Sequence, residues 1–148
     1  MRRALTLVEL LLTISILAFC LCGILLTYIS MFILTDLSRQ LTTTTNALQA
    51  KMEEIKRTDF DNLSALNGTS FNVSGFASSE AKGVIYVSNT AYTDLRRVHI
   101  ELSFRTRGRV FGGDKNLNGV ANIGEDYISV NGVNELRSPV ESVTLISR

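Results

Sequence analysis

The side chains best suited to chemistry lie in the stretch GDKNLNGVANIGED. This stretch fits the pattern D-x-[DN]-x-[DN]-G-x5-E of a calcium-binding loop, with the pattern residues Asp114, Asn116, Asn118, Gly119 and Glu125. Calcium takes about six to eight oxygen ligands, which alternate residues of such a loop can point inward around the turn that the glycine permits. We therefore predict a calcium site at residues 114–125, with the ligands Asp114, Asn116, Asn118, the backbone carbonyl of Val120, Asn122 through water, and Glu125.

The charge of this loop limits how tightly it can hold a metal. Only Asp114 and Glu125 bring charge to the ligand positions, so we expect weak binding, adequate where calcium is abundant, as outside the cell. The alternative is a plain hairpin turn built from turn-favouring residues, because the sequence before the loop has the pattern of a strand and not of a flanking helix. The next stretch, DYISVNGVNELRSP, resembles a degraded second loop through Asn131 and Asn134, to which we assign no metal.

A second candidate is Glu9, the one charge within an apolar run that follows Arg2 and Arg3. An ionised carboxylate is costly in hydrocarbon, so such a residue calls for a partner. No residue from 10 to 35 is charged, and this run exceeds the roughly 20 residues that a membrane-spanning helix needs. The two arginines predict a cytoplasmic N-terminus, with the residues after the span on the outer side.

Three alternatives for the apolar run are a buried helix of a soluble protein, a removable secretory signal and a lipoprotein signal that ends at Cys20. The run is long for a secretory signal, and no small-x-small cleavage site closes it. Phe19 stands where a lipoprotein signal needs a small residue. Both cysteines, Cys20 and Cys22, lie in this run, so the rest of the chain has no disulfide.

The helical pattern continues past the apolar run. Leu37, Leu41, Leu48, Met52 and Ile55 recur on one helical face, which predicts one helix from Leu5 to about Arg57 with an amphipathic second half. The weak helix formers Gly23 and residues 42–45 are places where it could bend. Alternating apolar residues then predict strands around residues 71–73, 84–87, 98–104 and 143–145. The predicted fold class is α+β, with the helix packed on a small antiparallel sheet.

The start of the chain, MRRALTLVEL, resembles the leader and helix start of the type IV pilin and pseudopilin family, with Ala4 for the family's usual Gly and Leu5 for Phe. The resemblance implies a pilin-like fold, cleavage by a prepilin peptidase after Ala4 and methylation of the new amine on Leu5. It also implies that Glu9 meets the N-terminal amine of a neighbouring subunit. The stretch ALQAKMEEIKRTDFDNL is similar to the minor-pilin and pseudopilin branch.

On this resemblance we expect a structural subunit of a type IV pilus or type II secretion filament, not an enzyme. The expected parts are a leader (1–4), a membrane-spanning helical half (5–35), an amphipathic half (36–58) and a small β-rich domain (59–148). The expected partners are other pilin or pseudopilin subunits, the prepilin peptidase, an inner-membrane assembly platform and the lipid bilayer. The expected location is the bacterial inner membrane, with the C-terminal domain periplasmic or extracellular, and then a filament. The alternative is a single-span anchored module that binds an extracellular ligand with calcium.

The remaining polar residues carry no catalytic constellation in the sequence. His99, the one histidine, falls on the polar side of a predicted strand and is expected at the surface. Arg105, Arg107 and Arg109 are expected on one strand face, as a solvated stripe or subunit contact rather than a nucleic-acid site. The net charge of +1 predicts no strongly charged partner.

Overall fold

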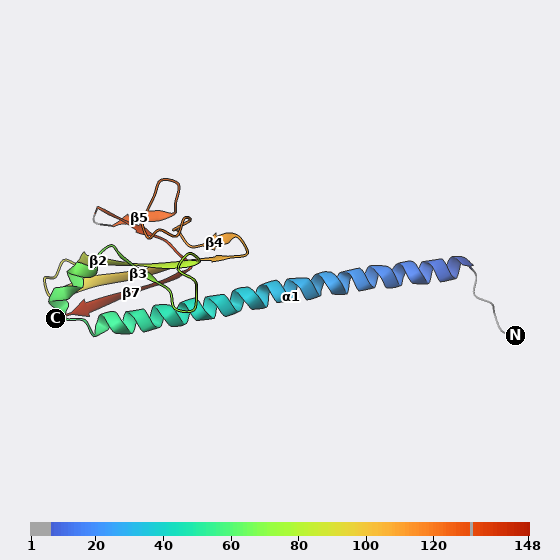
Figure 1. The fold of residues 1–148 in the computed structure, drawn as a ribbon, viewed down its shortest axis with the longest axis horizontal. Coiled ribbons are helices and arrows are strands. Elements are labelled where there is room, and N and C mark those ends of the chain that lie inside the picture. Colours follow the sequence, from blue (N-terminus) through green and yellow to red (C-terminus); the bar gives the residue numbers. More distant parts are fainter. Residues whose placement is uncertain (1–6, 131) are drawn as a thin grey trace. The chain divides into compact units, whose positions relative to one another are not determined.

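One uninterrupted α-helix opens the fold of the computed structural model, which describes residues 7–130 and 132–148. This helix, α1, runs Leu7–Lys56 and continues without a break through Gly23 and residues 42–45, the weak helix formers at which it could bend (Figure 1). Serine and threonine hydroxyls along it donate to the carbonyl oxygen four residues earlier, as Thr27 Oγ1 does to Gly23 O at 2.9 Å. These bonds satisfy the hydroxyl groups within the helix itself.

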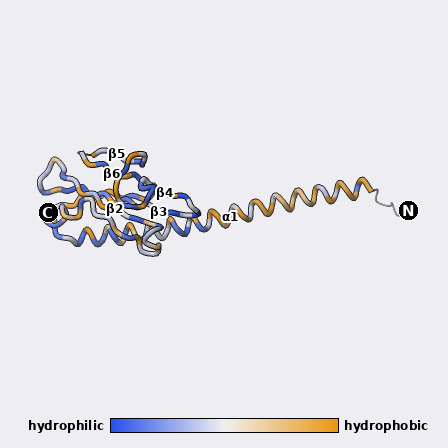
Figure 2. Tube along the Cα trace, turned by 45° about the horizontal axis from the view of Figure 1, so that its top comes forward, coloured by the Kyte–Doolittle hydropathy of each residue, from blue (hydrophilic) through white to orange (hydrophobic). Residues whose placement is uncertain are grey.

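The chain divides into two compact units, Met1–Arg39 and Gln40–Arg148. In the first unit every described residue up to position 35 is exposed. Figure 2 shows this part of α1 as almost continuously hydrophobic. By length and composition it is able to cross a membrane.

In the second unit, the last turns of α1 bury one side against a sheet. Leu48, Met52 and Ile55 are buried, as their spacing predicted, and Thr44 joins them one turn earlier. A threonine fits this buried position because its Oγ1 donates to Gln40 O at 2.8 Å. The α+β class is therefore confirmed, with the long helix packed on an antiparallel sheet.

The sheet has five antiparallel strands, in the order β1-β2-β3-β4 with β7 also paired to β3 (Figure 1). A 3₁₀-helix, η1 (Phe60–Leu66), connects α1 to the sheet. The strands are β1 (Thr69–Asn72), β2 (Ala81–Asn89), β3 (Leu95–Thr106), β4 (Arg109–Phe111) and β7 (Val140–Ser147). A separate hairpin pairs β5 (Tyr127–Val130) with β6 (Val133–Leu136). Asn134, expected in a degraded metal loop, lies in β6 opposite Ser129, while Asn131 lies outside the described residues.

The two faces of the sheet have different covers. Val98, Ile100, Leu102 and Phe104 of β3 share one face, are fully buried and form the core beneath α1, as their alternation predicted. The opposite face carries Val84 and Tyr86 of β2, against which Leu136 of the β5–β6 hairpin packs. Figure 1 shows the last turns of α1 and strand β5 on opposite sides of the sheet.

This second cover makes the prediction of a surface-exposed His99 wrong. His99 is 2% exposed, and its neighbours on the same face, Glu101 and Ser103, are fully buried. The alternation of side chains was read correctly, but the polar face lies beneath the hairpin and the preceding loop rather than in solvent.

The predicted stripe of three arginines on one strand face is also wrong. β3 ends at Thr106 and β4 begins at Arg109, so Arg107 lies in the turn between them, with φ of 48°. Arg109 pairs with Thr106 while Arg105 pairs with Val110, which places Arg105 and Arg109 on opposite faces. A tight turn after residue 106 therefore disperses the charges that a continuous strand would have aligned.

Candidate functional site

The predicted calcium loop follows β4 and is organised around a buried carboxylate. Asp114 is fully buried. Its Oδ1 accepts a hydrogen bond from Asn118 N at 3.1 Å, and its Oδ2 accepts one from Gly119 N at 2.6 Å. The same Asn118 N–H also donates to Asn116 Oδ1 at 3.0 Å. The first three predicted ligands are thus brought together by one backbone turn.

Three residues of this loop, Leu117, Gly119 and Gly124, adopt positive φ. Gly119 has φ of 80°, which glycine adopts readily, whereas Leu117 has φ of 59° and a side chain only 8% exposed. A non-glycine residue in the left-handed region costs on the order of 1–2 kcal/mol. Burial of the Leu117 side chain helps to offset that cost and anchors the loop.

The second acidic residue closes the loop from its far end. Glu125 Oε1 accepts from Lys115 N at 3.0 Å, and Glu125 Oε2 accepts from Asn122 N at 2.8 Å. The ammonium group of Lys115 donates to the carbonyl oxygen of Gly124. Its positive charge therefore lies near the end of the loop where Glu125 stands.

Several predicted ligand oxygens converge on one point, the side-chain amide of Asn122. Its Nδ2 donates to Val120 O at 2.7 Å, to Glu125 Oε2 at 3.2 Å and to Asn118 Oδ1 at 3.3 Å. The two N–H groups of this amide thus lie within hydrogen-bond distance of three oxygens that a hard cation could also bind. If the Asn122 amide rotates about its last bond, its oxygen replaces this nitrogen and adds to the oxygen set.

The residues present fit a weakly bound calcium ion better than a high-affinity one. Within residues 7–130 and 132–148 there is no group of three or more His, Cys, Asp or Glu side chains that could hold a metal. The oxygens that meet at the Asn122 amide come from the Glu125 carboxylate, the Asn118 amide and the Val120 carbonyl. Both oxygens of Asp114 accept backbone N–H groups instead. Amide and carbonyl oxygens suit calcium, and a low ligand charge weakens its binding.

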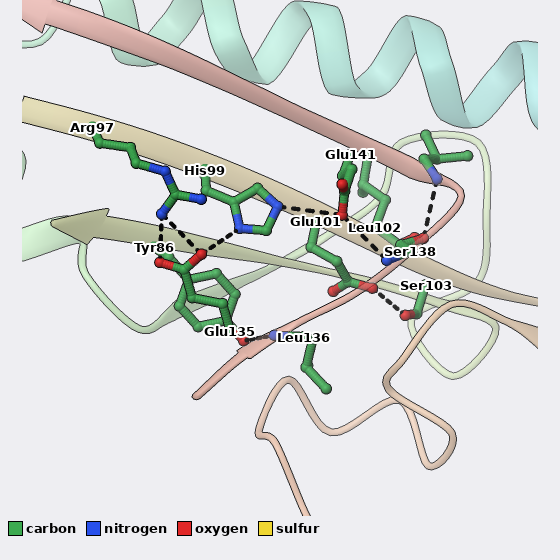
Figure 3. Close-up of polar contacts among 11 residues, drawn as sticks. Tyr86, Arg97, His99, Glu101, Leu102, Ser103, Glu135, Leu136, Ser138 and Glu141 are labelled. Atoms are coloured by element: carbon green, nitrogen blue, oxygen red, sulfur yellow. Dashed lines mark hydrogen bonds and ion pairs between the residues drawn. The ribbon is translucent and has the colours of Figure 1, made fainter. Parts of the chain in front are cut away.

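The loop is attached to the sheet through Ser103 and Glu101. Asp114 N donates to Ser103 Oγ at 3.2 Å, and Ser103 Oγ donates to Glu101 Oε1 at 2.5 Å (Figure 3). Burial raises the pKa of Glu101 to about 7, against the smaller opposing effect of the Ser103 hydrogen bond. The backbone just before the loop also needs a glycine at position 113, because it lies close to the backbone of Asp126 and Arg137. A Cβ at this position would stand 2.4 Å from Asp126 O and 2.6 Å from Arg137 O.

The second predicted site, at the start of the chain, is described only in part. Glu9 lies in the first turn of α1, and its backbone carbonyl accepts a hydrogen bond from Thr13 Oγ1 at 2.7 Å. A carboxylate in the first turn interacts favourably with the positive end of the helix dipole. Ala4 and Leu5, the predicted cleavage and methylation positions, lie outside the described residues.

A third group of interacting polar side chains was missed by sequence reasoning. Arg97, His99 and Glu135 meet between β3 and β6, although they lie far apart in sequence. The only signal was the alternation in the segment VNEL, where Glu135 and Val133 occupy the same side of a short strand. That signal could not identify which face of the larger sheet Glu135 would meet.

In comparisons with known proteins, the chain matches no family model, no curated protein and no solved structure.

Proposed function

We propose that this chain is a structural subunit of a type IV pilus or type II secretion filament, without catalytic activity of its own. The observation that supports it most is α1, a single 50-residue helix. Its first part is apolar and exposed, and its last turns pack against a sheet. Such a helix can store the subunit in a membrane and later provide the core of a filament. The pilin-like leader MRRALTLVEL supports the same proposal.

In this proposal Glu9 directs assembly. A prepilin peptidase at the bacterial inner membrane cleaves after Ala4, and the new amine on Leu5 is methylated. The cationic amine of one subunit then pairs with Glu9 of its neighbour on the assembly platform. A carboxylate in hydrocarbon costs several kcal/mol when it has no cation, so pairing favours an assembly in register.

The intact mass of the protein extracted from membranes tests this proposal. The expected mass corresponds to a chain that begins at Leu5 and carries one additional methyl group. The matched control is Ala4→Arg, which places a large cation at the cleavage position and should leave the leader attached. A mature chain that begins near Cys22 would overturn the proposal and support a removable signal.

A second candidate function rests on the loop at residues 114–125. In this alternative the chain stays in the membrane as a single-span anchor, and its outer domain binds an extracellular ligand when calcium orders the loop. The convergence of Val120 O, Glu125 Oε2 and Asn118 Oδ1 on one point favours it. Both functions allow calcium to stabilise the domain, but only the filament subunit requires cleavage after Ala4 with Glu9 retained.

A further inference from the structure

The β5–β6 hairpin meets the sheet at a group of charged side chains whose centre, Glu135 and His99, is buried. We call this group the Glu135 cluster, which consists of Arg97 and His99 of β3, Glu135 of β6 and Glu141 of β7. Glu135 and His99 are 1% and 2% exposed, respectively. Figure 3 shows the Glu135 carboxylate between the Arg97 guanidinium and the His99 ring.

The distances in the cluster define two contacts to the histidine ring. Arg97 Nη1 donates to Glu135 Oε1 at 2.7 Å and to Glu135 Oε2 at 2.9 Å. His99 Nδ1 lies 3.0 Å from Glu135 Oε2. On the other side of the ring, His99 Nε2 lies 3.5 Å from Glu141 Oε2, which is an ion-pair separation rather than a short hydrogen bond. Both ring nitrogens therefore face carboxylate oxygens.

Among residues 7–130 and 132–148, no other titratable group donates a hydrogen bond to either ring nitrogen. The Tyr86 ring stacks on the His99 ring with centroids 5.8 Å apart, and its hydroxyl accepts from Leu136 N at 3.2 Å. Glu101 and Asp114 are the further carboxyl groups buried on this side of the sheet. Arg97 is the neighbouring cation. The surroundings of His99 are thus rich in carboxylates, with one permanent positive charge.

The apolar contacts beneath the hairpin are few. Val84, Tyr86 and Leu136 form the buried cluster there, with Ala121 and Val133 packed at its edge. A small apolar contact leaves a large share of the attachment to the charged groups and to the Tyr86 hydrogen bond. A change of charge in the Glu135 cluster should therefore alter how firmly the hairpin is attached.

We propose that the Glu135 cluster is a proton-controlled latch, which holds the β5–β6 hairpin on the sheet while His99 carries a proton on both ring nitrogens. The doubly protonated ring donates toward Glu135 and Glu141, and the two positive charges of Arg97 and His99 then balance the two carboxylates. A neutral ring has one N–H, so it can donate to Glu135 or to Glu141 but not to both. The buried Glu135 carboxylate then keeps Arg97 as its one cation, and the loss of the second cation weakens its hold on the sheet.

The direction of the pH dependence follows from this balance. Histidine changes charge between about pH 5 and pH 8, so the hairpin should be attached firmly at the lower end of that range and loosened at the upper end. Its release would uncover Val84 and Tyr86 on the sheet. This inference does not depend on the filament or calcium proposals, because it uses only contacts within residues 84–141.

The experiment uses the full chain in detergent micelles and follows two quantities across this pH range. His99 is the only histidine in the sequence, so its ring resonance in an NMR spectrum reports its protonation without overlap. Amide hydrogen exchange of residues 127–136, corrected for the intrinsic rate at each pH, reports hairpin attachment. We expect protection of the hairpin to fall about tenfold as His99 loses its proton, which corresponds to about 1.4 kcal/mol of hairpin attachment. Amides of β3 should keep their protection.

Three variants separate the latch from other titrating groups. His99→Gln keeps a donor toward Glu135 but cannot titrate, so the pH-dependent step in hairpin protection should disappear. Glu135→Gln should lower protection at the acidic end and also remove the step. Glu101→Gln is a change of the same chemical type on the same buried face. In this variant hairpin protection should still change with pH, at the pH at which the His99 resonance titrates. β3 protection verifies that each variant is folded.

Two results would overturn the latch. One is constant hairpin protection in the wild-type protein while the His99 resonance titrates. The other is a His99→Gln variant that is folded and keeps the wild-type pH dependence.

Discussion

The burial of polar side chains on the second face of the sheet can be tested through Glu101, because its carboxyl makes the unfolding free energy depend on pH. Burial raises the pKa of its carboxyl from 4.5 to about 7, so the folded domain keeps this proton over a range in which the unfolded chain releases it. Unfolding is therefore favoured as the pH rises through that window. The stability linked to Glu101 is fully present below about pH 4.5 and is lost by about pH 7.

The size of this effect follows from the two pKa values. The difference between 4.5 and about 7, at about 1.4 kcal/mol for each pH unit, amounts to about 3 kcal/mol of unfolding free energy. Glu101→Gln stays neutral at every pH and can still accept the Ser103 hydroxyl. We therefore expect the variant to gain about 3 kcal/mol over the wild type as the pH rises through this window.

Urea denaturation of residues 36–148, followed by circular dichroism from about pH 4 to pH 8, measures this difference. The quantity to plot is the unfolding free energy of Glu101→Gln minus that of the wild type, because contributions from other titrating groups then cancel. Glu80→Gln, at an exposed carboxylate, is the matched control and should give a flat difference. A difference for Glu101→Gln that does not change with pH would refute the argument from burial.

The remaining predictions concern the loop, the membrane helix and the core. Millimolar calcium should raise the melting temperature of residues 36–148 relative to chelator, since an ion at about a hundred times its Kd adds about 2.7 kcal/mol. Asp114→Ala or Glu125→Ala should remove most of that rise in melting temperature, and Asn134→Ala should not. An equal melting temperature of the wild type in calcium and in chelator would show that the loop is a plain turn. Glu9→Leu should insert into membranes normally but enter filaments less, as quantified by immunoblots of membrane and filament fractions, and normal incorporation would contradict the pairing of Glu9. Ile55→Ala, at a side chain 1% exposed, should cost about 2–5 kcal/mol in urea denaturation, and a loss below 1 kcal/mol would contradict its place in the core.

The sequence was most informative where one periodicity extended over many residues. The helix could be predicted from residue 5 to 57 because its apolar positions recur over many turns, and Leu48, Met52 and Ile55 are buried as expected. Thr44 was missed because a threonine does not register in an apolar pattern, although its hydroxyl is satisfied by the backbone. Alternation in β3 likewise identified the four core residues of that strand.

Reasoning from sequence failed where a distant segment decided the environment of a residue. His99 was expected in solvent because polar residues alternate with apolar ones in β3, and that pattern is usual when one face of a sheet is open. The cover comes from residues 127–136, a hairpin of two four-residue strands whose docking site no local signal encodes. In the loop at residues 114–125, by contrast, local backbone turns bring the Asp114 and Asn116 side chains to Asn118 N, and their role as metal ligands stays a prediction.

The pairing of β7 with the central strand has a consequence for the order in which the domain can form. Residues 107–139 are synthesised between β3 and β7, so β3 emerges with one long edge open until β7 follows. Pairing across such a separation must offset the entropy of closing the intervening chain, which makes folding slower than local hairpin formation. During synthesis the domain therefore lacks its complete sheet until almost the whole chain has emerged. The tertiary fold is completed only after β7 has been made.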